Sequence, residues 1–179
     1  MIEQHTLSRL GFLVELPQRA LGELAAVSRL LRCEPHTVIF HAGDRADTLY
    51  GVLEGEVELS LTIRDKSLAA EVEFEEAVHV RVMEKDSQIV VDAARPGHVF
   101  GWSALSGRGR HTVTATCSMP AQVVAIPAQN LKTLCEQDPS LGYAVMKRLV
   151  DIISKRLDNR NQRLIEVWVE AFGVSKVAP

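Results

Sequence analysis

The residues best suited to chemistry lie just before position 105, in the sequence Phe-Gly-Trp-Ser-Ala at 100–104. Gly101 precedes a short segment that can begin a helical turn, and the first N–H groups of such a turn have no acceptor within it. These groups and the dipole of the turn favour a bound anion. Gly101 lets the backbone approach a ligand closely, and the hydroxyl of Ser103 adds a donor. The segment therefore predicts a main-chain cradle for negative charge.

Two arginines follow this cradle within a few residues. Arg108 and Arg110 each offer a fixed positive charge and a planar fork of donors, a geometry that suits a phosphate. Together with the cradle they predict a small anionic ligand that carries a phosphate. Spacing alone also allows an ordinary strand-to-helix turn with two surface arginines, so both interpretations stay open at this point.

The elements that must position these residues alternate in polarity with a period of two. Val57, Leu59, Leu61 and Ile63 alternate with polar residues, as in a strand that buries one face. Further short alternating stretches follow, separated by glycine turns. Many short strands at regular spacing predict a sandwich or roll of strands over about residues 32–126.

Helical patterns flank this strand-rich part. Pro17 suits a first helical position, and apolar residues at helical spacing follow it over about 17–31. Pro127 begins the C-terminal helical part, about 127–172, in which one long helix occupies most of the length. The whole chain, 1–179, is predicted to form a single α+β domain.

The long helix carries an apolar stripe at alternating steps of three and four residues. This spacing is typical of the a and d positions of a coiled coil, and the helix is longer than packing on the strands requires. We therefore predict a homodimer through the stripe, although helices that pack on their own core show the same spacing. The stripe, interrupted by one arginine, consists of Val150, Ile153, Leu157, Arg160, Leu164 and Val167.

Composition excludes several classes of protein. Hydrophobic residues make up 46% and charged residues 24%, an ordinary globular mixture rather than a disordered chain. A net charge of -3 gives no overall basic field for nucleic acid. Three cysteines without a CxxC pair favour a reduced, cytoplasmic location. No apolar run approaches the roughly 18 residues that a membrane span needs, so no membrane association is expected.

Two blocks of the sequence resemble one known family. The first block, residues 38–57, carries an aromatic residue at Phe40 and glycine turns at the expected places. The second block, residues 95–115, carries Phe100-Gly101 and the arginine that follows them. In this order they resemble the opening hairpins and the phosphate-binding cassette of the cyclic nucleotide-binding domain family, the effector domain of Crp/Fnr-type regulators. The resemblance covers nearly the whole chain.

The resemblance implies a fold and a site for a ligand, which is a cyclic nucleotide or another phosphate-bearing molecule. The fold is an antiparallel β-roll (a jelly-roll or double-stranded β-helix) with flanking helices and a long C-terminal helix. Transcription factors of this family carry a helix-turn-helix after the long helix, and few residues follow it here, so we expect a stand-alone form that does not bind DNA directly. The implied ligand-binding residues are Phe100, Gly101, Trp102, Ser103, Ala104, Arg110, His111, Thr112 and Asn161.

Two positions depart from the family's pattern. The residue after Phe-Gly is typically a glutamate that holds the ribose 2′-hydroxyl, whereas here it is Trp102, whose indole has one donor and no acceptor. The sequence Arg110-His111-Thr112 is one residue shorter than the family's spacing, and His111 stands where a small residue is usual. This added bulk predicts that cyclic AMP does not bind in the usual mode. A different nucleotide, another anion, or a self-packed pocket without ligand all remain open.

The segment between the two blocks is longer than the family's common hairpin. Its extra part, near residues 64–88, predicts a hairpin that extends beyond the roll, with polar breaks at 64–67 and 84–88. The hairpin is either simply solvated or an edge for a partner protein, since exposed strand edges pair readily unless they are charged. The acidic residues that supply such charge are Glu71, Glu73, Glu75 and Glu76.

These observations favour a regulatory module that signals through its long helix. A ligand would change the packing of that helix, and a partner protein would read the change, provided that the ligand binds the two helix arrangements with different affinity. The alternative is a ligand-free dimeric scaffold in which Trp102 plugs the pocket. An enzyme or a metal-binding β-barrel is disfavoured, because the sequence has no His-x-His pair and no recognisable catalytic constellation. We therefore expect neither catalysis nor a resident metal.

Overall fold

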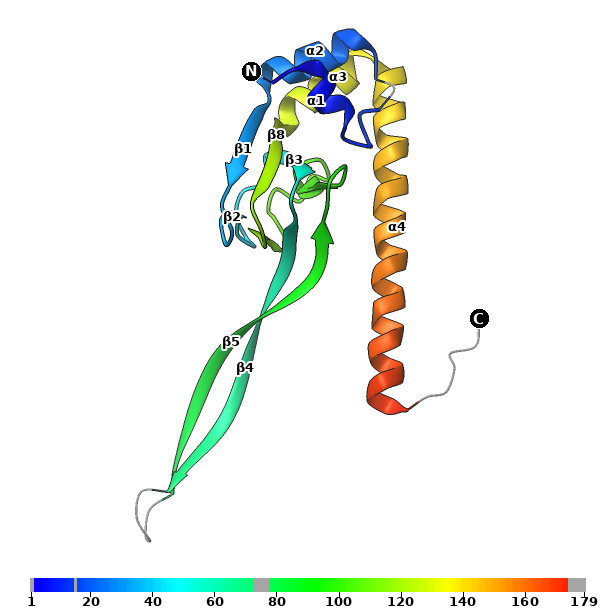
Figure 1. Ribbon diagram of the computed structural model, residues 1–179. Helices are drawn as coiled ribbons and strands as arrows, with labels where there is room; N and C mark the ends of the chain where they lie inside the picture. Colours follow the sequence, from blue (N-terminus) through cyan, green and yellow to red (C-terminus); the bar gives the residue numbers. More distant parts are fainter. Residues whose placement is uncertain (1, 15, 73–77, 174–179) are drawn as a thin grey trace.

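The computed structural model describes residues 2–14, 16–72 and 78–173, and only the backbone over 64–72 and 78–85. A roll of strands carries short helices at one end, and a long helix runs along its side and beyond it (Figure 1). The helices are α1 (Gln4–Ser8), α2 (Gln18–Val27), α3 (Ala128–Gln137) and α4 (Pro139–Phe172), with a 3-10 turn, η1 (Trp102–Ala104). The strands are β1 (Arg29–Cys33), β2 (Val38–Phe40), β3 (Thr48–Glu54), β4 (Val57–Val72), β5 (Val78–Ala94), β6 (Val99–Phe100), β7 (Thr114–Cys117) and β8 (Ala121–Pro127).

The strands form two four-stranded antiparallel sheets, in the orders β1-β8-β3-β6 and β2-β7-β4-β5. Alternate side chains of a strand point to one face, and the inward faces of the two sheets share one apolar core. This arrangement confirms the predicted antiparallel β-roll with flanking helices and a long C-terminal helix. The fully buried members of this core are Val52, Val57, Ala94, Phe100, Ala115, Cys117 and Val123.

A second apolar core lies at the helical end of the roll. Leu49 and Ile126 pair in register on β3 and β8 and turn their side chains toward the helices. Leucines and a phenylalanine from the N-terminal segment, including Leu10 and Phe12, pack against them and are fully buried. This core fixes α1, α2, α3 and the first half of α4 to one face of the roll.

The N-terminal boundary of the roll differs from the sequence prediction. The helix expected over 17–31 ends at Val27, and Arg29–Cys33 forms β1 instead. Ser28 closes the helix, because its hydroxyl donates to the carbonyl of Leu24 at 2.7 Å. Every residue of β1 pairs with β8, so strand pairing overrides the helical spacing of the leucines there. The short helix α1 was not predicted.

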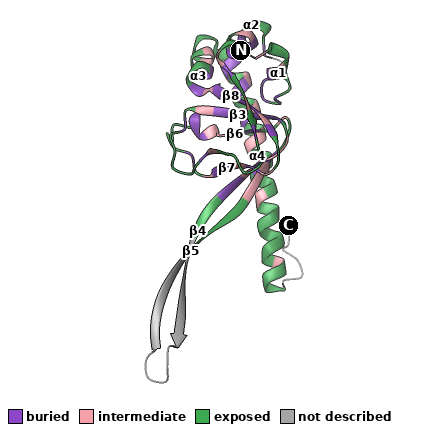
Figure 2. Cartoon of the chain, turned by 60° about the vertical axis from the view of Figure 1, so that its left-hand side comes forward, coloured by how far each residue is buried: buried purple, intermediate pink, exposed green. Residues whose placement is uncertain are grey.

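The strands β4 and β5 form a hairpin that extends beyond the roll (Figures 1 and 2). They pair along their length, from Val57 opposite Ala94 to Val72 opposite Val78. The strand β4 also pairs with β7, but only over residues 57–60. Among the described residues, no third strand covers the rest of the hairpin.

Expectations for this hairpin are partly met. The extended hairpin is confirmed, but the breaks expected at 64–67 and 84–88 are wrong. Both stretches are strand, because the residues of 64–67 pair with 83–86 and so continue the ladder. The proposed acidic edge is not tested. Glu73, Glu75 and Glu76 lie outside the described residues, and Glu71 is described only in its backbone.

The helix α4 begins at Asp138, whose carboxylate accepts hydrogen bonds from the N–H groups of Ser140 and Leu141 at 3.0 and 3.1 Å. Its first half buries Val145 and Leu149 in the helical core. Its second half runs past the roll and is largely exposed (Figure 2). Over the part of the chain that is described, no helix combines the length and the apolar character of a membrane span.

Candidate functional site

The predicted cradle is a 3-10 turn that follows β6. Gly101 has φ +78°, and a Cβ there would lie 3.0 Å from Tyr50 Cδ2 and 3.1 Å from the Thr48 carbonyl oxygen, so any other residue at this position is strained. The N–H of Ala104 donates to the carbonyl of Gly101 at 3.1 Å. The turn leaves the two preceding N–H groups, those of residues 102 and 103, without an internal acceptor.

The Trp102 side chain lies against α4. The Arg156 guanidinium carbon is 5.0 Å from the centre of the indole ring, a distance at which the ring face attracts a cation. Trp102 is half-buried and packs against the helical core together with Leu105, Ile152 and Ile153. The indole therefore joins the turn to the long helix.

His111 fills space beside the turn. Its ring stacks on Phe40 with centroids 3.6 Å apart and planes 9° apart, and it is only 5% exposed. A Cβ on Gly101 would lie 3.5 Å from His111 Cε1, so the imidazole borders the cradle. Burial lowers the pKa of His111, although the charges of Asp44 and Asp47 act in the opposite direction.

Arg110 is engaged with a neighbouring loop. Its Nη1 donates to the carbonyl of Gly43 at 2.6 Å, and its side chain is exposed. Two backbone hydrogen bonds reinforce the same connection. The N–H of Gly43 donates to the carbonyl of His111 at 2.8 Å, and the N–H of His111 donates to the carbonyl of Asp44 at 2.9 Å. The loop before β3 and the loop after η1 are thus fastened together, and the guanidinium predicted to hold a phosphate binds a carbonyl.

A groove of about 570 Å³ separates the roll from the second half of α4. It brings together two of the predicted ligand-binding residues, Thr112 and Asn161, but Phe100, Gly101, Trp102, Ser103, Ala104, Arg110 and His111 do not line it. Phe100 is instead fully buried in the roll. The residues that line the groove are Leu61, Val90, Val91, Thr112, Val113, Arg160, Asn161, Arg163, Leu164 and Val167.

Asp92 links the base of the hairpin to α4. Its Oδ2 lies 3.4 Å from Arg160 Nη2 and 3.6 Å from Arg156 Nη1. One carboxylate thus serves two guanidinium groups, and Nε of Arg160 is buried with no hydrogen-bond acceptor among the described residues. Burial lowers the pKa of Arg156, while Asp92 raises it. No local sequence pattern indicates this cluster, because the register of α4 against β5 is a tertiary feature.

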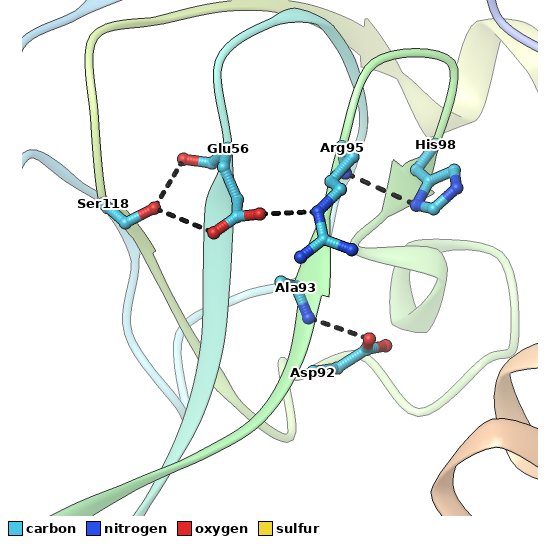
Figure 3. A network of polar contacts seen from close by, with 6 residues as sticks. All are labelled: Glu56, Asp92, Ala93, Arg95, His98 and Ser118. Carbon is cyan, nitrogen blue, oxygen red and sulfur yellow. Dashed lines mark hydrogen bonds and ion pairs between the residues drawn. The ribbon is translucent and has the colours of Figure 1, made fainter.

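The turn between β5 and β6 is held by a polar network (Figure 3). Nε of Arg95 donates to Glu56 Oε2 at 2.7 Å, and the backbone N–H of Arg95 donates to His98 Nδ1 at 3.4 Å. Ser118 donates to the same glutamate at 3.4 Å. Burial and the charge of Arg156 lower the pKa of His98. This network fixes the approach of the chain to the cradle.

The predicted stripe on α4 lies mostly at the surface. Val150, Leu157, Leu164 and Val167 are each between 56% and 61% exposed, whereas Ile153 and Arg160 are half-buried. The same spacing continues toward the start of the helix through exposed Tyr143 and Met146. Across the described part of the chain, no three His, Cys, Asp or Glu residues gather in a way that could hold a metal ion.

Comparison with known proteins adds to this geometry. Residues 76–138 match the family model of the cyclic nucleotide-binding domain. A protein from Geobacter metallireducens GS-15, described as a cyclic nucleotide-binding protein, is 25% identical with a TM-score of 0.65. That match covers 88% of this chain and 99% of the other. No curated protein matches the chain.

Two further solved structures share the fold. The sensor domain of the transcriptional regulator DNR from Pseudomonas aeruginosa is 17% identical with a TM-score of 0.60, over 83% of this chain and 91% of that one. The regulatory domain of Toxoplasma gondii PKA, solved with cAMP, is 17% identical with a TM-score of 0.57, over 87% of this chain and 48% of that one.

Proposed function

We propose that this chain, which has the fold of the cyclic nucleotide-binding domains of Crp/Fnr-type regulators, is a regulatory module without catalytic activity. It binds a nucleotide or another small anion and signals through α4 to a partner protein. It acts as a homodimer in the cytoplasm, a location that its free cysteines, Cys33, Cys117 and Cys135, favour.

The observation that carries this proposal is the groove between the roll and α4. Its walls combine apolar residues, such as Val90 and Leu164, with two arginines and the polar side chains of Thr112 and Asn161. Apolar walls with a few polar groups are typical of small-molecule sites, and a volume of about 570 Å³ suits a nucleotide. Arg160 and Arg163 line the groove, so both can contribute positive charge to an anion bound there. The cAMP bound in the structure of the Toxoplasma gondii domain supports a nucleotide as the class of ligand.

The binding mode that we propose differs from the one implied by the cassette. Arg110 is held by Gly43 and His111 fills the space beside the cradle. The anionic part of the ligand therefore binds to arginines of α4, Arg160 and Arg163, rather than to Arg110. Because α4 forms one wall of the groove, a bound ligand favours one position of the helix over others, which is the condition for signalling.

Isothermal titration calorimetry with cyclic and linear nucleotides tests this proposal. We expect saturable binding of at least one of them, weakened about tenfold by Arg163→Gln through the loss of a charged hydrogen bond. Lys147→Gln removes the same charge from α4 outside the groove and should leave the Kd unchanged. Arg110→Ala should also leave it unchanged. A Kd that depends on Arg110 and not on Arg163 would place the ligand in the cradle instead.

A ligand-free dimeric scaffold is the second candidate. It is favoured by the stack of His111 on Phe40 and by the hydrogen bond from Arg110 to Gly43, since both engage predicted ligand-binding side chains within the protein. This candidate predicts that none of the nucleotides raises the thermal midpoint of unfolding, although a ligand of the folded chain must do so.

A further inference from the structure

A second hollow lies on a different face of α4. It has a volume of about 470 Å³ and is bounded by Gly11 of the N-terminal segment, by Gly97 and His98 of the turn between β5 and β6, and by one side of α4. It shares no lining residue with the groove. The N–H of Gly11 donates to the carbonyl of Gly97 at 3.2 Å, so two of its walls are fastened to each other.

The α4 wall of this hollow is rich in positive charge. Arg148, Lys155 and Arg156 line it together with a single carboxylate, Asp151. Asp151 follows Arg148 by three residues, Lys155 follows Asp151 by four, and Arg156 follows Arg148 by eight. These spacings place the four side chains on one face of the helix. Arg148 donates to the carbonyls of Gly11 and Val14 and so contributes its charge while it fastens the N-terminal segment. The lining carries three permanent cations against one anion.

Arg156 is the residue that requires a partner. It is 8% exposed, and neither Nη1 nor Nη2 has a hydrogen-bond acceptor among the described residues. Its only ionic partner in that part of the chain, Asp92, is 3.6 Å away and is shared with Arg160. A guanidinium keeps its charge in proteins, and a buried donor without an acceptor is costly. Both nitrogens are buried, so an anion in the hollow balances the charge of this guanidinium by electrostatic attraction rather than by a direct hydrogen bond to them.

We propose that this hollow is a second ligand site, which binds the phosphate group of a small phosphorylated metabolite. Lys155 binds the phosphate oxygens, Arg156 adds its positive charge from the wall of the hollow, and the side-chain amide of Asn159, which also lines the hollow, adds a donor. A phosphate monoester carries about -1.5 to -2 charge at neutral pH, which matches several cations better than one carboxylate does. The volume leaves room for a body of sugar size, since small-molecule pockets start at about 300 Å³.

The site does not depend on the proposed function of the groove, but Arg156 connects the two regions. Its guanidinium contacts Trp102 of the cradle turn on one side and Asp92, the partner of Arg160, on the other. A phosphate bound here therefore fastens α4 to the N-terminal segment and to the turn before β6. Occupancy of this site alters the same helix that the groove ligand contacts.

Calorimetric titration with ribose 5-phosphate, at constant ionic strength, tests this inference on the full chain. We expect saturable binding that Lys155→Gln weakens about tenfold and that Asp151→Asn strengthens, because this variant removes the one negative charge of the lining. Both residues are exposed, so neither change should unfold the chain. Lys147→Gln, which removes a charge elsewhere on α4, and Arg163→Gln, in the groove, should leave the Kd within about twofold.

Several results would overturn the inference. Ribose that binds as well as ribose 5-phosphate would show that the phosphate is not recognised. An equal loss for Lys147→Gln would show that only general charge is sensed. Binding of a phosphopeptide without binding of ribose 5-phosphate would exclude a small metabolite. Loss of ribose 5-phosphate binding in Arg163→Gln alone would place this ligand in the groove. Failure of the second site can therefore be distinguished from failure of the proposed function.

Discussion

Trp102 occupies the position at which the family resemblance implies an acid, and its environment explains what it does instead. The indole covers the buried guanidinium of Arg156 and packs on the helical core. A glutamate there would pair with a cation by charge, whereas the indole does so through its ring face and excludes water. The residue thus maintains a contact between the cradle turn and α4.

Replacing this ring should therefore reduce stability. We expect Trp102→Ala to lower the free energy of unfolding by about 2 kcal/mol, through lost apolar contacts and a lost cation–π contact. Urea denaturation followed by circular dichroism measures this. Trp168→Ala, at the exposed end of α4, is the matched control and should lower the free energy of unfolding of the monomer far less. Equal effects of the two substitutions would contradict this role for Trp102.

The buried imidazole of His111 should make stability depend on pH. Its pKa in the folded chain is lowered from the ordinary 6.5, so between the two values the unfolded chain binds more protons and stability rises with pH. Stability should accordingly fall as the pH drops below about 6.5. His98, whose pKa is also lowered, contributes in the same direction.

Denaturation at neutral and mildly acidic pH checks this expectation. His111→Phe keeps an aromatic ring against Phe40 but cannot titrate, so the loss of stability in acid should become smaller. If His111→Phe has the same pH dependence as the original chain, the imidazole is not the group responsible.

At this scale the sequence predicted the unusual residues but not their partners. The bulk of Trp102 and His111 was evident because both residues depart from the family's pattern at these positions. Arg156 and Asp92 were missed because neither has a distinctive neighbour in the sequence. Their meeting depends on how α4 lies against β5, which local spacing does not encode.

Among the elements, the 3-10 turn after β6 has the tightest geometric requirement. Gly101, Gly107 and Gly109 have similar positive φ angles, but only at Gly101 would a Cβ meet atoms at 3.0 and 3.1 Å. We expect Gly101→Ala to cost about 1 kcal/mol more than Gly109→Ala, because both pay for the left-handed backbone and only the first must displace Tyr50. Thermal and urea unfolding of the two variants measure the difference. An equal cost would mean that the turn adjusts freely.

The elements themselves were largely predictable where one period dominated. The alternation from Val57 to Ile63 identified β4, and the spacing of three and four identified α4. Predicted boundaries were wrong where strand pairing determines the structure. The strand β1 has a helical pattern in the sequence but pairs with β8, and the polar stretches of the hairpin pair with each other. The groove also needed tertiary information, because Leu61 on β4 is 41% exposed and forms one of its walls rather than the core.

For the whole molecule, the exposed stripe on α4 predicts a dimer. Substituting charge at its centre, in the double variant Leu157→Glu/Leu164→Glu, should yield monomers, because like charges would face each other across a coiled-coil seam. Light scattering coupled to size exclusion measures the mass. Gln162→Glu, an exposed change outside the stripe, should remain dimeric. A chain that is already monomeric without substitution would contradict the prediction.

The roll, the hairpin and α4 meet around the groove, which is the arrangement that the proposed signalling requires. One wall of the groove comes from β4 and β5 and the other from the half of α4 that extends past the roll. The hollow that we propose as a phosphate site lies on another face of the same helix. Both proposed ligand sites thus lie on the element that also presents the apolar stripe.

The most direct measurement of the central claim is amide chemical-shift mapping of the ¹⁵N-labelled chain with cyclic AMP and cyclic GMP. If the groove is the nucleotide site, the largest changes should centre on Thr112, Val113 and Asn161 and extend along α4. Changes confined to residues 101–104 and 110, or no changes with either nucleotide at millimolar concentration, would contradict the account.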